Sequence, residues 1–374
     1  MLSYSINVDQ IKKLKKIHQT YTLQWEKLDS FSAEKKSFIK RHSIISNIGA
    51  STRIENAILT NAEIDWVDTE LSKEANITFD EKQDFIKNKL SKDKERSIEE
   101  VAAYRDALEI VYNSYKDFTV LRESDIKGLH RELMKYYSNS DYYRGDYKKQ
   151  INSVVEIKSI TGKKRKVMVT ADPGIITQTS MADLVRWYNK TINREPWVLP
   201  VSVEFIFRFL AIHPFQDGNG RLSRLLFQLI LMNSEDKYFS NLIPYLALDR
   251  EIEKTRSEYY LVLRKCSGGL FNIDPTRYNY NFFLDYMLKV ITASVDNILF
   301  YSQKFEDYNL LSETDIKIYN CFKEKPEKNL QTKDIVGELT IPRRTAIYSL
   351  NKLVERGFLQ IIGKGAGVRY KLVF

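Results

Sequence analysis

The feature that most constrains this chain is a pair of apolar segments, residues 201–212 and 222–232, separated by a polar turn rich in glycine. In the second segment, apolar side chains recur at the three- and four-residue spacing of one buried helical face. These positions are Leu222, Leu225, Leu226, Leu229 and Ile230. The pattern predicts two helices joined by a polar turn at the start of the second helix.

The glycines of this turn predict a site for phosphate groups. Gly218, Asn219 and Gly220 lie where free backbone N–H groups and the positive end of a helix dipole meet. Glycine allows a ligand to approach the backbone closely. Arg221 and Arg224 lie one helical turn apart beside these amides, and each can donate two hydrogen bonds to phosphate oxygens. A solvated basic face is the alternative for the two arginines.

Two further residues of the turn carry chemistry that would act on a bound nucleotide. His213 precedes the turn, and imidazole is the side chain best suited to accept a proton near neutral pH. Taken alone, a histidine before proline is more often a structural residue at a helix end. Asp217 can hold a hard cation such as Mg²⁺ that bridges phosphates.

Taken together, the turn and its flanks resemble the signature of the Fic family, and every fixed position of that signature is filled. The matching residues are His213, Pro214, Phe215, Gln216, Asp217, Gly218, Asn219, Gly220, Arg221 and Arg224. A string of this length and chemical coherence is far more specific than a lone glycine motif.

The resemblance implies a protein adenylyltransferase that uses ATP and Mg²⁺. It implies that His213 deprotonates a target hydroxyl, which attacks the α-phosphorus while pyrophosphate leaves. Asp217 would hold Mg²⁺, and Phe215 would fix the loop in the core. Gly218, Asn219 and Gly220 would bind the α- and β-phosphates, and Arg221 and Arg224 the β- and γ-phosphates. Transfer of this kind needs positioning and charge neutralisation more than covalent help.

A second motif, Ser51-x-x-x-Glu55-Asn56, resembles the inhibitory motif of Fic proteins that carry their own inhibitor before the core. Ser51 and Glu55 are four residues apart and are expected on one helical face, within an inhibitory helix at about residues 43–60. Glu55 would pair with Arg224 in place of the γ-phosphate. The alternative is that Glu55 is an ordinary surface acid beside Arg53.

Fainter resemblance extends on both sides of the signature. Tyr143, Arg144 and Gly145, and a hairpin around Thr161 and Gly162, resemble the lead-in and the target-docking flap of the family. The flap is long and has an unusual cluster of lysine and arginine. Tyr259 and Tyr260 are candidates for stacking on adenine, with packing in the core as the equal alternative.

The expected fold class is mainly α, with three regions. An N-terminal helical region at 1–95 precedes a Fic core with a β-hairpin at 96–305, and a winged helix-turn-helix domain follows at 306–374. Ser97 and Glu100 predict a capping box at the start of a core helix. In the last region, Thr340 is the predicted N-cap of the third helix, Pro342 lies in its first turn and Gly357 ends it.

The third region carries basic residues that suit a phosphate backbone, although such modules also serve protein contacts or dimerisation. They are Arg343, Arg344, Lys352, Arg356, Lys364, Arg369 and Lys371.

Composition sets the broad class. The chain has 374 residues, of which 43% are hydrophobic, as in an ordinary globular protein. Its formal net charge of +9 suits polyanionic partners such as nucleotides or nucleic acid, although an excess of this size is also common on inert surfaces. Cys266 and Cys321 lie too far apart in the sequence for a metal knuckle and are expected to be reduced. His18, His42 and His130 have no ligand-like spacing and are expected to be structural or surface residues. We find no membrane span or signal peptide and predict a cytoplasmic protein.

The predicted function is protein adenylylation with autoinhibition by Glu55. The expected targets are an unknown protein and the chain itself. Two alternatives stay open: removal of AMP, with Glu55 positioning a water, and a DNA-binding regulator whose Fic core senses nucleotide. The sequence leaves the target, the acceptor residue and the existence of a homodimer undecided.

Overall fold

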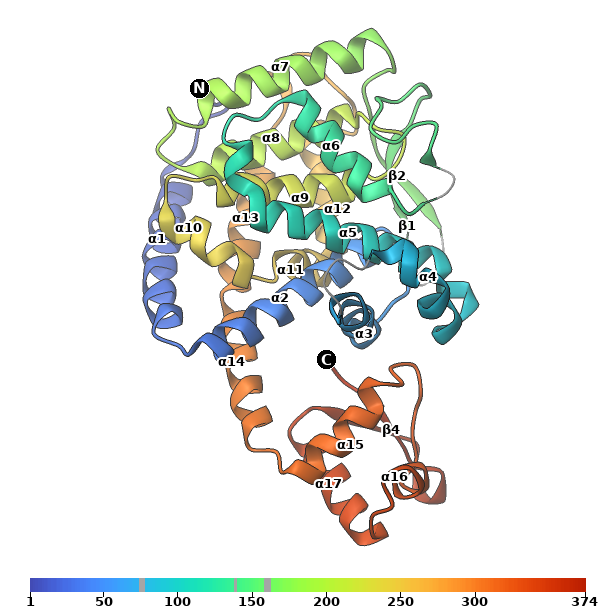
Figure 1. Ribbon diagram of the computed structural model, residues 1–374. Helices are drawn as coiled ribbons and strands as arrows, with labels where there is room; N and C mark the ends of the chain where they lie inside the picture. Colours follow the sequence, from blue (N-terminus) through green and yellow to red (C-terminus); the bar gives the residue numbers. More distant parts are fainter. Residues whose placement is uncertain (74–77, 138–139, 158–162) are drawn as a thin grey trace. The chain divides into compact units, whose positions relative to one another are not determined.

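The computed structural model describes residues 1–374 except 74–77, 138–139 and 158–162. The chain is mainly helical and divides into two compact units, each assembled from separate stretches of sequence (Figure 1). The first unit contains Met1–Ala57 and Arg96–Ile298, and the second contains Ile58–Glu95 and Leu299–Phe374.

Helices form most of the first unit. Before the hairpin they are α1 (Val8–Asp29), α2 (Ala33–Ile54), α5 (Glu95–Ser114) and α6 (Glu123–Met134). After the hairpin come α7 (Ile175–Thr191), α8 (Val198–Ile212), α9 (Asn219–Met232), α10 (Lys237–Leu242), α11 (Leu248–Lys254), α12 (Arg256–Ser267), α13 (Asn281–Ser294) and the start of α14 (Asp296–Asn309).

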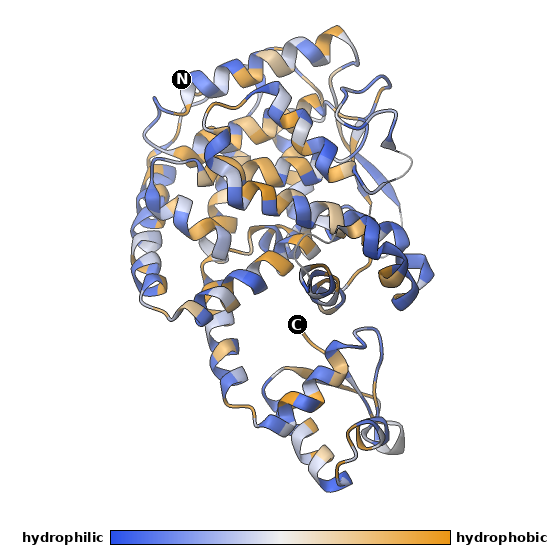
Figure 2. Ribbon diagram, viewed as in Figure 1, coloured by the Kyte–Doolittle hydropathy of each residue, from blue (hydrophilic) through white to orange (hydrophobic). Residues whose placement is uncertain are grey.

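Helices α8 and α9 form the centre of this unit and confirm the two helices predicted on either side of the polar turn. Every residue of α8 from Leu199 to Ile212 is buried, and α9 is buried from Arg221 to Met232. Both helices are mainly apolar, as Figure 2 shows. A helix that is apolar all round is stable only inside a core. The turn that joins α8 and α9 is therefore held on both sides by a buried helix.

The N-terminal helices pack on this core, so the structure groups residues 1–57 with it. Helix α1 packs on α10 and α13, and α2 packs on α11 and α9. The compact units thus divide the chain differently from the three expected regions. Which segments fold alone stays a prediction.

The hairpin consists of β1 (Ser153–Ile157) and β2 (Lys164–Val169), which pair antiparallel. Val154 lies opposite Met168, and the register shifts at a bulge between Val154 and Val155. The predicted turn at Thr161 and Gly162 lies outside the described residues. The paired strands on either side agree with the expected hairpin.

The second unit combines α3 (Asn61–Ser72) and α4 (Phe79–Lys89) with the C-terminal part of the chain. Its C-terminal elements are α15 (Glu313–Lys323), α16 (Thr332–Leu339), α17 (Arg343–Glu355), β3 (Leu359–Ile362) and β4 (Arg369–Leu372), the predicted order of three helices and a hairpin. Ala62 of α3 belongs to the same apolar cluster as Phe322, Leu350 and Phe358. Lys94 bridges Glu63 and Glu327, at 2.8 and 2.7 Å.

Two predicted helix starts are wrong. Helix α5 begins at Glu95, directly after the 3₁₀ turn Lys92–Lys94, so Ser97 and Glu100 lie inside it and form no capping box. Thr340 ends α16 in a left-handed conformation, with φ of 51°, and Pro342 is the N-cap of α17. In the first case the helix begins two residues before the expected cap, and in the second the preceding helix α16 uses the expected cap residue as its own C-cap. Gly357 follows α17 with φ of 72°, as predicted.

Part of the positive charge expected to be available in the C-terminal region is used internally. The Lys352 ammonium lies 2.7 Å from the Asp315 carboxylate, and the Arg356 guanidinium lies 2.8 Å from Asp307. Arg343 and Arg344 stay exposed at the start of α17. Among the described residues, none of the helices has the length and apolar character that crossing a membrane requires.

Candidate active site

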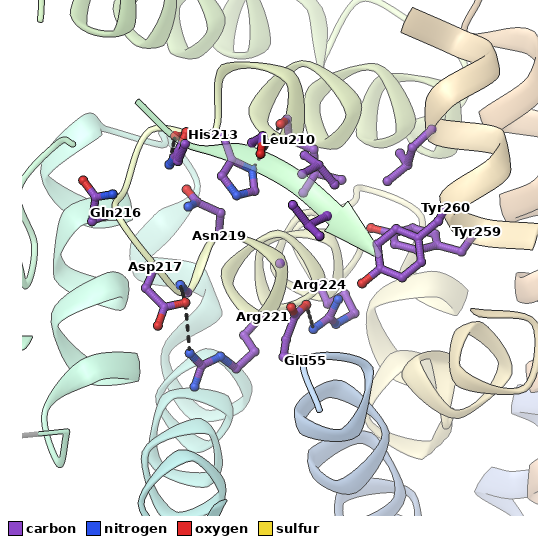
Figure 3. Close-up of a pocket in the computed structure, with 17 residues that line it drawn as sticks. Glu55, Leu210, His213, Gln216, Asp217, Asn219, Arg221, Arg224, Tyr259 and Tyr260 are labelled. Carbon is purple, nitrogen blue, oxygen red and sulfur yellow. Dashed lines mark hydrogen bonds and ion pairs between the residues drawn. The ribbon is translucent and has the colours of Figure 1, made fainter. Parts of the chain in front are cut away.

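One cavity in the first unit collects most of the predicted site residues (Figure 3). Its volume is about 210 Å³, and it is lined by the α8–α9 turn, the start of α9, the hairpin, α12 and the end of α2. The predicted residues in its wall are Glu55, His213, Asp217, Gly218, Asn219, Gly220, Arg221, Arg224, Tyr259 and Tyr260. Ser51 and Asn56 are the two predicted site residues outside this wall.

His213 caps the C-terminus of α8 in a left-handed conformation, with φ of 52° and ψ of 60°. Its Nδ1 lies 3.3 Å from the carbonyl oxygen of Leu210. A carbonyl only accepts hydrogen bonds, so we assign the ring proton to Nδ1 and a lone pair to Nε2. Burial, reinforced by the charge of Lys148, lowers the pKa of His213 to about 4. The imidazole is therefore neutral at pH 7 and able to accept a proton.

The loop after His213 is closed by its own side chains. Asn219 accepts a hydrogen bond from the Phe215 amide through Oδ1 at 2.9 Å and donates from Nδ2 to the Phe215 carbonyl at 2.7 Å. The buried Phe215 ring stacks on His130, with ring centres 3.8 Å apart. Phe215 thus lies in the core as expected. The Asn219 side chain binds the loop, so only its backbone amide is available to a phosphate.

The glycines flank the start of α9 as the sequence predicts. Gly218 is the N-cap, with φ of 77°, a left-handed conformation that favours glycine. The amides of Asn219 and Gly220 are the first two of α9, and amides in this position have no carbonyl one turn earlier to bond. A Cβ atom on Gly220 would collide with the Glu55 carboxylate. An anionic group therefore already lies directly over the predicted phosphate site.

Asp217 lies at the mouth of the cavity, with 42% of its side chain exposed. Its Oδ1 accepts a hydrogen bond from the Gly218 amide at 2.6 Å, and its oxygens lie 3.8 Å from the Arg221 guanidinium and 3.6 Å from that of Arg96. Burial opposes ionisation, but these cations and the amide together lower the pKa of Asp217 below its ordinary value. The carboxylate is held ionised.

Arg221 is buried and lies between two carboxylates. Besides Asp217, it faces Glu100 of α5 at 3.8 Å. The ion pair joins Arg221 to Asp217, four residues earlier in the sequence (Figure 3). Because both carboxylates lie beyond hydrogen-bonding distance, the guanidinium can still donate hydrogen bonds to another anion.

Arg224 is held by α2. Its Nε donates to Ser51 Oγ at 2.8 Å, and its Nη2 donates to the Ser51 carbonyl at 2.8 Å. Nη2 also donates to Glu55 Oε1 at 2.9 Å, the contact drawn in Figure 3. Glu55 therefore lies against Arg224 as expected, through a single donor, Nη2, which it shares with the Ser51 carbonyl. Nη1 of Arg224 is buried with no hydrogen-bond partner among the described residues. This orphaned donor is free for a ligand oxygen.

Asn56 lies apart from this contact. It follows the C-cap Glu55 with φ of 76°, and its Oδ1 accepts a hydrogen bond from Arg256 at 2.9 Å. Left-handed backbone is more accessible to asparagine than to most residues. Asn56 therefore ends α2 and leaves Glu55 turned toward Arg224.

Tyr259 and Tyr260 line the cavity from α12 and are almost fully buried. Their ring centres lie 5.4 Å apart, and Tyr259 also packs on Phe283 and Tyr286. Burial raises the pKa of Tyr259 to about 12. Both rings thus serve the core and also present a surface to the cavity.

The comparisons with known proteins agree with this geometry. Residues 120–231 match the profile of the Fic/DOC family. A Fido domain-containing protein of Dictyostelium discoideum is 33% identical over 105 residues, which are 24% of this chain and 69% of that protein. The chain belongs to the Fic/DOC family.

Two further proteins show how much of the chain the similarity covers. Protein adenylyltransferase fic-1 of Caenorhabditis elegans is 30% identical over 140 residues, 37% of this chain and 23% of that protein. The chain therefore spans less than a quarter of that relative. A Fic family protein from Desulfovibrio desulfuricans superposes with a TM-score of 0.56 at 22% identity, covering 100% of this chain and 98% of that one. The predicted mainly helical Fic fold is confirmed.

Sequence reasoning missed several residues of this Fic site. Arg96 and Glu100 reach Asp217 and Arg221 from α5. His130 accepts a hydrogen bond from the Gly145 amide at 2.9 Å and donates to the Asp217 carbonyl at 3.0 Å. These residues are scattered singly along the sequence. The one sequence feature close to these residues was the Tyr143-Arg144-Gly145 segment, which resembles the lead-in of the family.

The Fic site fits a magnesium ion that takes most of its ligands from a nucleotide. Among the described residues, no group of three or more histidine, cysteine or acidic side chains gathers around a metal position. Asp217 is a single ionised carboxylate, and it lines the same cavity as the backbone amides at the start of α9 that are expected to bind phosphate. Mg²⁺ is commonly bound by one or two carboxylates together with substrate phosphates and water. Asp217 is the residue that would hold it.

Proposed function

We propose that this chain is a protein adenylyltransferase, restrained by Glu55, that moves AMP from ATP to a hydroxyl of a protein side chain. The observation that carries the proposal is the composition of one cavity. A neutral imidazole, the amides at the start of α9 and two buried arginines open into the same space. The relationship to fic-1 supports the same chemistry.

The reaction assigns a separate task to each group. Nε2 of His213 accepts the proton of the target hydroxyl, whose oxygen then bonds to the α-phosphorus. The bond from that phosphorus to the bridging oxygen breaks, and pyrophosphate leaves. Mg²⁺ held by Asp217 would neutralise charge on the phosphates. The α9 amides, Arg221 and Arg224 hold the phosphate oxygens where negative charge accumulates.

Glu55 supports the restraint because its carboxylate lies in the phosphate site. It pairs with Arg224 at 2.9 Å and lies over Gly220. The cavity of about 210 Å³ is smaller than the roughly 300–1,000 Å³ of ordinary ligand pockets. A γ-phosphate at this position would meet a carboxylate of like charge. ATP would then bind without its α-phosphorus in line with the attacking oxygen.

Transfer of label from ATP tests the proposal. Protein incubated with Mg²⁺ and ATP labelled at the α-phosphorus should become labelled, whereas ATP labelled at the γ-phosphorus should leave no label. Mass spectrometry should find one added AMP on a hydroxyl side chain. The Glu55→Gly variant should be used beside the parent chain, because restraint would hide a slow reaction. Label from the γ-phosphorus would identify a kinase instead.

One observation favours removal of AMP as a second function. Glu55 lines the same cavity as His213, so a carboxylate is available to position a water for attack on the phosphorus of an AMP-modified side chain. Incubation of an AMP-modified protein with the parent chain should then release AMP, and Glu55→Gly should release none. Equal release by both proteins would exclude this role for Glu55.

A further inference from the structure

A short segment before the hairpin holds the loop that carries His213. The carbonyl oxygens of four consecutive loop residues accept hydrogen bonds from Lys148 and Asn152. Lys148 Nζ donates to Ile212 at 3.0 Å and its amide to Pro214 at 2.8 Å, and Asn152 Nδ2 donates to His213 at 3.3 Å and to Phe215 at 2.8 Å. Two residues therefore satisfy the carbonyls on both sides of His213.

These bonds matter because the loop conformation is unfavourable by itself. The last carbonyls of a helix have no intrahelical partner, and α8 ends at Ile212. The left-handed backbone of His213 is unfavourable for a residue other than glycine. Such a conformation persists when the surrounding contacts determine it. The bonds from Lys148 and Asn152 are contacts of that kind.

The same ammonium group also binds the base of the hairpin. Lys148 Nζ donates to Asn152 Oδ1 at 2.8 Å and to Thr170 Oγ1 at 3.1 Å. Asn152 directly precedes β1, and Thr170 directly follows β2. With Ile212, these acceptors use all three donors of the ammonium. Lys148 thus joins both ends of the hairpin to the loop of His213.

The charge of Lys148 also acts on the imidazole. Lys148 is 2% exposed, and burial lowers its own pKa to about 8, so it is still charged at pH 7. Its charge disfavours a second proton on His213, whereas Glu55 of α2 and Asp217 of the loop favour one. Arg221 and Arg224 of α9 and Tyr259 and Tyr260 of α12 also line the cavity.

We propose that Lys148 is a positioning residue of the Fic site, which fixes the His213 loop to both ends of the hairpin and keeps the imidazole in its proton-accepting form. This inference rests on the proposed function for its kinetic consequence and on the structure alone for its effect on His213. Lys148 is not among the residues that line the cavity, so we expect it to act through His213.

Lys148→Met tests the proposal, with Lys148→Arg as the conservative variant and the adjacent, exposed Lys149→Met as the control. All three are made in the Glu55→Gly chain. In Lys148→Met we expect kcat to fall about 10²-fold with the KM for ATP within about twofold, because the imidazole is misplaced and the phosphate site is not. The acid limb of kcat/KM should move to higher pH. Lys148→Arg should recover most of kcat, and Lys149→Met should match its parent.

Imidazole NMR gives a readout that needs no turnover. The chain has four histidines, so single substitutions assign the His213 signal. Its pKa should rise in Lys148→Met and stay unchanged in Lys149→Met. A folded Lys148→Met chain with unchanged His213 titration and unchanged kcat overturns the proposal. If Lys148→Met fails to fold, Lys148→Arg decides: an unchanged titration supports the proposal, and a His213 pKa that rises although the charge is retained overturns it. Loss of the proposed function would appear separately, as a Glu55→Gly parent that transfers no AMP.

Discussion

At the scale of single residues, Glu55 is the side chain whose removal should raise activity. Its carboxylate takes one donor of Arg224 and the space over Gly220. Glu55→Gly should increase AMP transfer by about tenfold or more, because Ser51 still holds the guanidinium in place while the phosphate site opens. Initial rates with α-labelled ATP measure the change. Adding Arg224→Ala should abolish the increase. No increase in Glu55→Gly would show that Glu55 does not restrain transfer.

His213 should be needed for transfer and not for binding. His213→Ala removes the proton acceptor and should lower the rate by about 10²- to 10⁴-fold. The affinity for ATP should stay near that of the parent, because the amides and arginines that bind phosphate are untouched. Calorimetric titration and initial rates, both in the Glu55→Gly background, separate the two effects. Transfer at the parental rate would remove His213 from the mechanism.

The site could be predicted as far as its residues are close in sequence. One string of the sequence contains His213, Asp217, Gly220 and Arg224, and the structure opens all of them into one cavity. Lys148 could not be found this way, because nothing marks it apart from its exposed neighbour Lys149. Its function depends on three acceptors brought together by folding.

At the scale of elements, a buried polar network fixes α2 to the core behind Arg224. Asp249 of α11 accepts a hydrogen bond from the Tyr104 hydroxyl of α5 at 2.9 Å, and its amide donates to Asn47 of α2 at 3.0 Å. Gln228 of α9 also reaches Asp249, at 3.5 Å. Four helices therefore meet at Asp249, two of them through its carboxylate and α2 through its backbone amide. The position of Ser51 and Glu55 depends on this junction as well as on their own contacts.

The junction should make stability depend on pH. Burial raises the pKa of Asp249 to about 6, although Arg224 opposes the shift. A carboxyl with a raised folded-state pKa adds stability that is full below the unfolded pKa of about 3.9 and is lost as the pH rises through 6. Asp249→Asn should remove that loss, so the difference in unfolding free energy between variant and parent should shift by about 2 kcal/mol between pH 4 and 7 in favour of the variant.

Denaturant unfolding at several pH values measures the shift. Comparison with the parent is essential, because His130 and His213 act in the opposite direction. Burial lowers the pKa of both to about 4, so the stability they add is present above about 6.5 and lost as the pH falls toward 4. A difference between Asp249→Asn and its parent that is constant with pH would show that Asp249 does not titrate in this range.

Helices were predictable from periodicity, whereas the first residues of α5 and α17 were not. The apolar spacing in α9 needs only the local sequence, and the helix follows it from Asn219 to Met232. The start of α17 depends instead on α16, which ends with Thr340 in a left-handed conformation. The backbone of the preceding element determines which residue caps the next helix, and residue type alone does not predict that backbone.

At the scale of the whole molecule, the division into units depends on contacts that no local pattern reveals. Residues 58–95, which contain α3 and α4, follow α2 directly in the sequence, yet they belong to the unit formed with residues 299–374. Ala62 joins the apolar cluster of that unit, and Lys323 pairs with Asp65 at 3.1 Å. These partners lie more than 200 positions away along the sequence. A composition shift near residue 310 was visible, and its partner segment was not.

This division gives a specific expectation for truncation after residue 309. All residues of the proposed site belong to the first unit, so the shortened chain with Glu55→Gly should still transfer AMP. Residues 58–95 should lose protection, because deletion removes Phe322, Leu350 and Phe358 from the cluster that contains Ala62 and also removes Glu327, a partner of Lys94. Hydrogen exchange and limited proteolysis should show rapid exchange and new cleavage within 58–95, with slow exchange retained in α8 and α9.

Untruncated chain carrying the same substitution is the control. If 58–95 keep their protection after truncation, their stability comes from within that segment or from other parts of the chain. If α8 and α9 lose theirs, the first unit does not fold without the C-terminal residues, because two stretches that share a core can be separated only when each retains enough buried apolar surface of its own.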